Sequence, residues 1–224
     1  VEAVRLLQES RAQAEAMEQW AHNLMTLNQI ATSLASSLDA HEILDTAVWH
    51  LIELTDIDYG AALILEDDGQ HGRVIAEHPV AELSDFRLSI PSLPAAEQAL
   101  TAGSIYQVDA TTHPALLDSM KEQGRSLDFH SLLLIPLIAR DELIGILLLA
   151  SQERPHRFTD EEKDMCQTVA SQAAVAVANA RLVQDIQQQQ RALLHKSRAL
   201  TAESSKLDAI LHNVADGLVV TDNA

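Results

Sequence analysis

The longest periodic pattern of apolar side chains runs through the C-terminal part of the chain, from Thr159 to about Val214, without proline or glycine. One column repeats at every seventh residue: Ile186, Leu193, Leu200, Leu207 and Val214. This spacing places the side chains on one stripe of an α-helix, which can be buried only against a second helix. At about 1.5 Å per residue the helix would be ~80 Å long, more than the width of a small domain. We therefore expect it to leave its own domain and connect to another.

The neighbouring column of the same helix is mostly polar. It lies four residues after the first column and consists of Gln190, Ser197, Ser204 and Leu211. Polar residues at these positions weaken the seam between two packed helices. A weak seam is typical of a helix pair that can change its register or rotation. An inert spacer helix would have the same pattern, so that alternative stays open.

A second apolar stripe occupies the N-terminal part of the chain, where residues 1–38 are predicted to form a helix. Its members step by three and four residues: Met17, Trp20, Leu24, Leu27, Ala31, Leu34 and Leu38. This spacing also indicates a helix that packs against another helix. We therefore predict a homodimer held by both terminal helices, through Leu24, Leu27, Leu34, Val183, Ile186, Leu193, Leu200 and Leu207.

The middle of the chain is predicted to form a compact sheet domain. All six prolines and six of the seven glycines lie between Gly60 and Pro155. Asp39 and Glu42 resemble a capping box at the start of a helix that precedes this segment. Short helices are expected at 94–103 and 114–124. Periodicity and turn residues predict strands at 59–66, 73–78, 87–90, 104–108, 131–139 and 143–151.

The last two predicted strands are apolar at nearly every position. A strand that is apolar on both faces is covered on both faces, so we place these two at the centre of the sheet. Thr159 and Glu162 then form a capping box that opens the long C-terminal helix. The predicted fold class is α+β, with about six mostly antiparallel strands. The long terminal helices cover one face as a dimeric bundle, and short helices and loops cover the other.

The chain is strongly acidic, with 33 Asp and Glu residues against 15 Lys and Arg. A net charge of −18 argues against binding to nucleic acid or to an anionic membrane surface. No signal peptide and no apolar run long enough for a transmembrane helix is present, so we expect a cytoplasmic protein. The chain begins and ends in mid-pattern, which indicates a piece of a longer protein.

Few residues offer catalytic or metal-binding chemistry. The single cysteine, Cys166, excludes an intrachain disulfide, and its apolar surroundings predict a buried, inert thiol. His130 and Ser131 are neighbours on a predicted strand and therefore point to opposite faces, which excludes a catalytic pair. The histidines lack the close spacing of metal ligands. His71 and His78 flank a predicted hairpin strand and are expected at the surface.

Four motifs, in this order, resemble those of a GAF domain: Ser-Leu-Leu-Leu-Ile-Pro-Leu at 131–137, Glu-Leu-Ile-Gly-Ile-Leu-Leu-Leu at 142–149, Phe-Thr-Asp-Glu-Glu at 158–162 and Ala-Ser-Gln-Ala-Ala-Val-Ala-Val-Ala-Asn-Ala-Arg-Leu at 170–182. Residues 207–222 look like the opening of a PAS domain. The predicted domains are a coiled-coil linker helix at 1–21, a GAF domain at 22–185, a signalling helix at 186–206 and a truncated PAS start at 207–224.

The resemblance implies a regulatory module of a signalling protein, in the manner of the GAF domains of bacterial sensor histidine kinases. It implies dimer helices on one face of the sheet and a small-molecule pocket on the other, under residues 84–130. PAS and kinase domains would follow in the same chain. A dimerisation and spacer module that binds no ligand is the first alternative. An enzyme that modifies small molecules is the second, and the lack of a paired nucleophile and base argues against it.

Six polar residues are the candidate ligand contacts by position: Tyr106, Asp109, His113, Arg125, His130 and Ser131. Purely structural roles are the alternative for each, such as a turn cap for Asp109. Haem bound through His113 or His130 is the one cofactor left open. Bilin is not supported, because Cys166 is on the long helix rather than in the pocket region. The signature of cyclic-nucleotide GAF domains is absent. His195 and His212 lack the context of a phosphorylated kinase histidine, so no kinase activity is expected.

Overall fold

The structure is a computed structural model that describes residues 17, 25–79, 87–91, 94–109, 129–152 and 154–221. Residues 1–180 form one compact unit, and residues 181–224 form a second unit. The compact unit is built on a sheet of six strands, each antiparallel to its neighbours, which confirms the predicted α+β class. The strands are β1 (Tyr59–Leu65), β2 (His71–His78), β3 (Arg87–Ser89), β4 (Tyr106–Asp109), β5 (Ser131–Ala139) and β6 (Glu142–Ser151).

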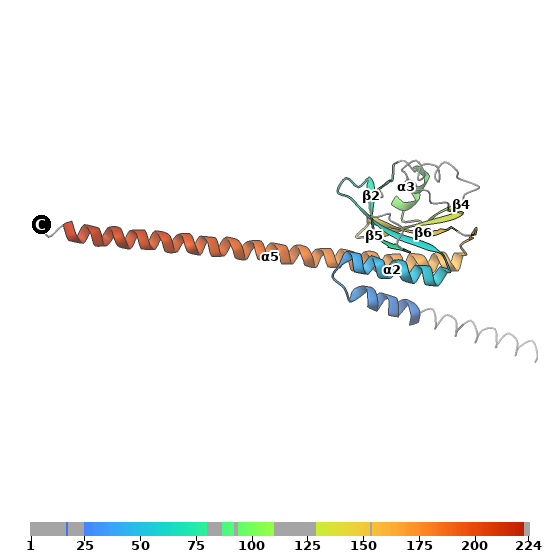
Figure 1. Cartoon of the computed structure of the whole chain (residues 1–224), viewed down its shortest axis with the longest axis horizontal. Helices are drawn as coiled ribbons and strands as arrows, with labels where there is room; N and C mark the ends of the chain where they lie inside the picture. The colour runs from blue at the N-terminus through green and yellow to red at the C-terminus, as the bar shows by residue number, and fades with distance from the viewer. Residues whose placement is uncertain are drawn as a thin grey trace, which may run out of the picture. The chain divides into compact units, whose positions relative to one another are not determined.

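The strand order across the sheet is β3-β2-β1-β6-β5-β4, so β1 and β6 form the central pair (Figure 1). The prediction that residues 131–139 and 143–151 lie at the centre is right for β6 and wrong for β5. β5 lies between β6 and the edge strand β4. Both faces of β5 are nevertheless covered, because every residue of this strand except Ile138 is buried. Its apolar run therefore reports burial on both faces rather than position in the sheet.

Helices cover both faces of the sheet (Figure 1). On one face lie α2 (Ala40–Thr55), residues 25–35 and the first part of α5 (Asp160–Thr221). α3 (Pro94–Thr101) packs on the other face. Each face of the sheet carries its own hydrophobic core, because successive side chains of a strand point to opposite faces. Leu133 and Ile135 point to α2 and α5, whereas Leu132 and Leu134 point to the α3 side. The predicted helix at 114–124 lies outside the described residues.

The long C-terminal helix predicted from Thr159 to about Val214 is a single helix of 62 residues. It continues past Gly217 to Thr221. Residues 166–180 bury a stripe of small side chains against the sheet: Cys166, Val169, Ala170, Ala173, Ala174, Val177 and Ala180. Small side chains allow the helix axis to approach the strands closely.

The cap of α2 is confirmed, but not its predicted partner. Asp39 Oδ1 accepts a hydrogen bond of 2.8 Å from the N–H of His41. Glu42 does not close the capping box on Asp39. The hydroxyl of Ser37 instead accepts from the N–H of Asp39 at 3.0 Å and donates to Glu42 Oε2 at 2.7 Å. Ser37 therefore stands between the two members of the predicted pair.

Two turns set the registers of the paired strands. Between β5 and β6, Arg140 and Asp141 both have positive φ, 54° and 65°, as the favoured two-residue hairpin turns require. Glu142 is not part of this connection, because it pairs with Ala139 and begins β6. Between β1 and β2, the Asp68 carboxylate accepts from His71 Nδ1 at 2.6 Å and from the N–H groups of Gln70 and His71. These hydrogen bonds, that of the His71 side chain first, lower the pKa of Asp68 to about 2.

β2 contains one extra residue, Ile75. In the pairing with β1, Ala62 faces Ala76 and Leu63 faces Val74, which leaves Ile75 without a partner on β1. This bulge reverses the alternation, so Val74 lies in the core on the α3 side and Ala76 in the core under α2. His78, two residues further on, then reaches α2.

His78 and His71 are partly exposed, and each pairs with a carboxylate. His78 Nε2 lies 2.8 Å from Asp45 Oδ1 on α2, and its side chain is 31% exposed. His71 is 40% exposed and pairs with Asp68. Both histidines therefore keep surface-accessible side chains, as predicted, and the carboxylate partner of each is what the sequence did not predict.

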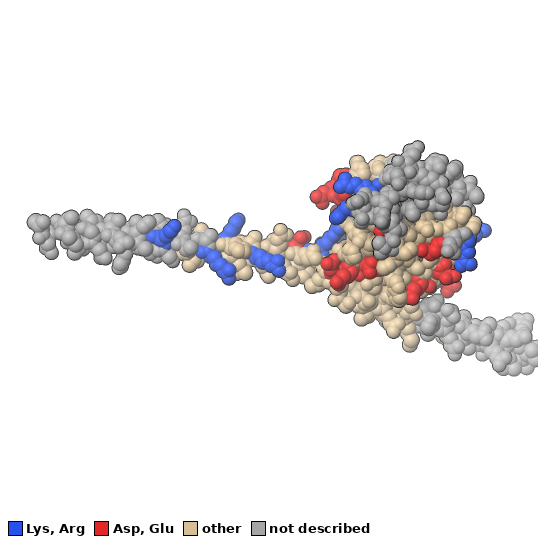
Figure 2. All heavy atoms as spheres, viewed as in Figure 1, with Lys and Arg blue, Asp and Glu red and all other residues tan. Residues whose placement is uncertain are grey.

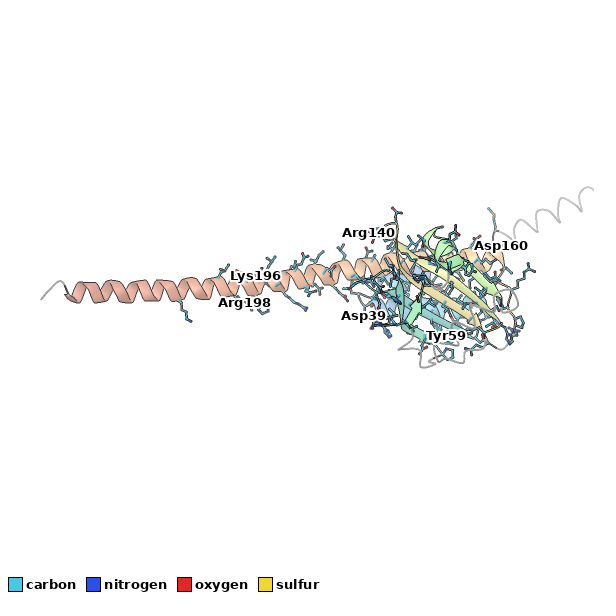
Figure 3. All side chains as sticks on the ribbon, turned by 90° about the horizontal axis from the view of Figure 1, so that it is seen from above. Asp39, Tyr59, Arg140, Asp160, Lys196 and Arg198 are labelled. Carbon is cyan, nitrogen blue, oxygen red and sulfur yellow. The ribbon has the colours of Figure 1, made fainter. Side chains whose placement is uncertain are left out.

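Charge is unevenly distributed between the two units (Figure 2). Residues 1–180 contain 28 acidic and 10 basic residues, so the compact unit carries the whole net charge of −18. Residues 181–224 contain five of each sign. The basic residues of this unit include Lys196 and Arg198, which project from α5 (Figure 3).

Candidate functional site

The predicted ligand contacts within the described residues lie on or beside β4 and β5 but not on one face of the sheet. Tyr106 packs on the α3 side, whereas Ser131 lies on the α5 side with Leu133. Asp109 is opposite Ser131 in the pairing of these strands, and Tyr106 is opposite Leu134. The Tyr106 side chain is half-buried and packs against the core on the α3 side. His130 is exposed at the start of the same strand. His113 and Arg125 lie outside the described residues, as does most of the 84–130 segment expected to cover a pocket.

Ser131 has a structural partner. Its side chain is 4% exposed, and its Oγ accepts a hydrogen bond of 2.7 Å from the backbone N–H of His156. His130 is exposed on the other side of the strand, so the two neighbours point apart as predicted. The hydroxyl of Ser131 thus ties β5 to the segment that leads into α5.

The same segment carries the N-terminal cap of α5. Glu162 Oε2 accepts from the N–H of Thr159 at 2.6 Å and from its hydroxyl at 2.8 Å. Thr159 Oγ1 accepts from the N–H of Glu162 at 3.2 Å, which completes the predicted capping box. α5 accordingly begins at Asp160 (Figure 3).

His156 joins the strand contact to the helix cap. Its Nε2 lies 3.3 Å from Glu162 Oε1, and its ring packs edge-on against Phe158 with centroids 4.8 Å apart. Both members of the ion pair are mostly buried, with His156 21% and Glu162 19% exposed. We call Ser131, His156, Thr159 and Glu162 the α5 joint. Its members connect a sheet strand to the first turn of the long helix. The sequence alone identified the cap but not the link through His156.

The pKa of Glu162 is lowered within this joint. Burial raises it, and the hydrogen bonds from the backbone and side chain of Thr159 together with the positive charge of His156 outweigh that effect. A lowered folded-state pKa contributes stability that is present above the unfolded pKa and lost as pH falls through the folded pKa.

We therefore expect the stability difference between the wild type and Glu162→Gln to shrink as pH falls below about 4.3, the ordinary range of a glutamate carboxyl. At pH 7 the variant should unfold more readily, because a glutamine amide carries no charge toward His156 and caps the helix less well. Urea unfolding at a series of pH values measures this. Parallel curves for the two proteins at all pH values would show that the carboxylate charge plays no part in the joint.

Cys166 is buried, as predicted from the sequence. Its side chain is 0% exposed, and burial, with a smaller contribution from the charge of Glu162, raises the thiol pKa to about 12. A thiolate is the nucleophilic form of cysteine, so this thiol is inert in the folded protein.

Cys166 should accordingly resist iodoacetamide at pH 8 in the folded protein and react fully once the protein is unfolded in urea. Mass spectrometry after timed quenching gives both rates, with a free cysteine peptide as the reference. Modification of the native protein at a rate close to that of the peptide would contradict the burial of this residue.

The opposite face of the sheet contains a polar pair that sequence reasoning missed. Tyr59 is fully buried at the start of β1, its ring 5.6 Å from that of Phe129. Its hydroxyl donates to Glu77 Oε2 at 3.2 Å. A tyrosine at the start of an apolar strand was the available signal, because a buried phenol generally has a hydrogen-bond partner. Tyr59 is labelled on the sheet in Figure 3.

The predicted dimer contacts divide into two groups. Leu34 is 1% exposed and Leu27 packs partly against the same core, so these side chains are covered largely within their own chain. Leu34 therefore has no surface left for a partner. Val183 is half-buried, and the apolar residues further along α5 are open: Ile186 is 47% exposed, Leu193 66% and Leu200 67%. Leu194, which lies outside the predicted column, is 58% exposed. Leu24 and the side chain of Leu207 lie outside the described residues.

Metal-binding clusters and membrane-spanning helices are both absent from the described part of the chain. Within it, His, Cys, Asp and Glu side chains form no group of three or more that could hold a metal ion. In the same residues, no helix combines the length and the apolar character needed to cross a membrane. Of the two histidines considered as haem ligands, His113 and His130, only His130 lies within the described residues, and it is exposed.

Comparison with known proteins gives a consistent picture. The family model for the GAF domain matches residues 39–177. The GAF domain of a phosphoenolpyruvate-protein phosphotransferase from Coxiella burnetii superimposes with a TM-score of 0.60 at 26% identity, covering 73% of this chain and 96% of that one.

Curated relatives match over a smaller share of their own length. The circadian input-output histidine kinase CikA of Thermosynechococcus vestitus is 23% identical over 210 residues, which are 87% of this chain and 29% of that protein. Diguanylate cyclase A of Treponema denticola is 43% identical over 51 residues, 22% of this chain and 14% of that protein. The chain thus spans less than a third of either relative.

Proposed function

This chain belongs to the GAF domain family, and from that premise we propose that it is the regulatory module of a signal-transduction protein, which relays the state of its sheet domain through α5 to an output domain. The observation that carries the proposal is the α5 joint. It connects β5, which carries the candidate ligand contact Ser131, to the cap of a 62-residue helix.

The relay would work by population shift. A ligand or partner protein held near Ser131, at the start of β5, would favour one arrangement of the joint over another. A change at Ser131 would reach Glu162 through His156, because His156 contacts both. A few kcal/mol of differential binding is enough to move such an equilibrium substantially.

The output end of the relay would be a homodimer. Ile186, Leu193 and Leu200 are exposed apolar residues of one column, and pairing with a second copy would cover them. The polar residues Gln190 and Ser197 keep the seam weak, so two arrangements of the pair could have similar energies. This is the property that a relay needs and a rigid spacer does not.

The relatives support a proposal about the protein that contains this module. A histidine kinase matches 87% of this chain, so we propose a sensor kinase as the parent protein, with a PAS domain beginning near residue 207. In such a protein the module would work in the cytoplasm and would contain no catalytic residue of its own.

Native mass spectrometry of the purified chain tests both parts of this proposal at once. The expected result is a dimer that retains a small molecule, or that binds one from a metabolite mixture at one molecule per chain. A dimer that binds nothing would favour the spacer alternative. A monomer would contradict the relay, and turnover of a metabolite would favour the enzyme.

A further inference from the structure

A cavity of about 240 Å³ lies between α2 and β2, separated by β1 and β6 from the candidate ligand contacts on β4 and β5. It is lined by His41, Asp45, Val74, Ile75, Ala76, Glu77 and His78. Every lining residue is described and belongs to the compact unit. We propose that this cavity binds a small organic cation, a primary ammonium on a short apolar chain.

The bulge at Ile75 builds the site. If Ile75 took a regular place in the ladder instead of forming a bulge, Ala76 and His78 would lie on the same side as Val74, and His78 would point away from Asp45. With the bulge, His78 Nε2 lies 2.8 Å from Asp45 Oδ1. Bulges often re-aim a side chain at a functional site, and here the bulge turns an imidazole into the cavity wall.

The charge of the lining selects a cation. Asp45 contributes a carboxylate whose side chain is 43% exposed, and no lysine or arginine lines the cavity. Glu77 is not the anchoring carboxylate, because its Oε2 accepts from Tyr59 on the other face of the sheet. The compact unit carries a net charge of −18, which raises the local concentration of cations.

The remaining groups define the shape of the ligand. An ammonium has three donors, for which the Asp45 carboxylate and a ring nitrogen of His41 are possible acceptors, while His78 Nε2 donates to Asp45 Oδ1. Ile75 and Ala76 supply an apolar wall for a short hydrocarbon chain. The cavity lies between α2 and the sheet, so its occupant would contact both. This inference stands independently of the proposed relay and needs no dimer.

Three probes of one length and different charge test the inference: n-butylammonium, butyrate and 1-butanol. Backbone amide shifts are followed in ¹⁵N-labelled protein up to about 50 mM of each probe, since so small a ligand is expected to bind in the millimolar range. The expected result is a saturable shift with butylammonium alone, centred on residues 41, 45 and 74–78. Asp45→Asn should weaken binding at least about tenfold. Asp141→Asn, which removes an exposed carboxylate from the β5–β6 turn, should leave it unchanged.

The amide spectrum also reports whether each variant is folded, and His41→Ala, at an exposed lining residue, provides a second test if Asp45→Asn unfolds. That variant should weaken binding about threefold, as expected for one lost hydrogen bond. Four results would overturn the inference: no saturation with butylammonium, equal binding of butyrate or butanol, equal weakening by Asp45→Asn and Asp141→Asn, or unchanged binding in His41→Ala. A failure of any kind here leaves the dimer measurements unaffected, so the two proposals are judged separately.

Discussion

Gly145→Ala is expected to lower the free energy of unfolding by about 3 kcal/mol, a large part of the stability of an ordinary domain. Gly145 lies on the central strand β6, opposite Ile64 of β1 and Leu137 of β5. A Cβ atom at this position would stand 2.4 Å from the carbonyl oxygen of Leu63 and 3.1 Å from Leu137 Cδ1. The backbone of the central strand pair cannot move aside without disturbing its hydrogen bonds. Relieving the clash would therefore cost a large part of the pairing energy between β1 and β6.

Two other glycines of the same sheet provide matched controls. At Gly60 the added Cβ would meet Val48 Cγ1 at 2.9 Å, a side-chain atom that can shift, so Gly60→Ala should cost less than Gly145→Ala. At Gly72 the nearest atom is Leu63 Cβ at 3.4 Å, an ordinary contact, and the cost should be below about 1 kcal/mol. Urea unfolding of the three variants measures the order. Equal losses at Gly145 and Gly72 would show that the close approach of β6 to β1 is not what fixes glycine there.

Replacing Gln190, Ser197 and Ser204 together with leucine is expected to lower the dimer dissociation constant at least about 100-fold. In a dimer paired through the exposed leucine column, these positions lie beside it in the seam, and fully burying one leucine contributes about 1.5–3 kcal/mol. The two arrangements of the helix pair would then no longer be close in energy. In the parent protein, this variant should hold the output in one state irrespective of ligand. Sedimentation equilibrium measures the dissociation constant.

The matched control places three leucines on the opposite side of the same helix, at Gln188, His195 and Ala202. This variant adds the same number of apolar side chains to α5 but leaves the proposed seam unchanged. Its dissociation constant should stay within about threefold of the wild type. If both triple variants associate equally, added hydrophobicity alone explains the effect, and the leucine column is not the dimer contact. If neither changes, α5 does not pair through this column.

Local sequence signals predicted the elements of this fold well. Each of the six strands was found from apolar runs and alternation, since both reflect burial on a pleated surface. The cap of α5 followed from Thr159 and Glu162, because both members of a capping box lie within one turn. The buried thiol of Cys166 followed from the apolar residues around it. These inferences need only a few neighbouring residues.

The features that the sequence did not predict depend on contacts between residues that are far apart in the chain. The bulge at Ile75 follows from pairing with β1, and nothing within β2 marks it, so the orientation of His78 toward Asp45 was missed. Leu34 fits a dimer stripe as well as an intrachain core, because both have the same period; only the packed structure separates them. The α5 joint likewise joins Ser131 to His156 across 25 positions.

The pairing of two chains through α5 is the central claim, and oxidative cross-linking tests it most directly. In a Cys166→Ala background, Leu200→Cys places a thiol in the exposed column, and His195→Cys places one on the other side of the helix. A parallel pair predicts that Leu200→Cys forms a disulfide-linked dimer rapidly at low protein concentration, while His195→Cys remains monomeric on a denaturing gel. Equal cross-linking of the two variants, or none in either, would contradict the account.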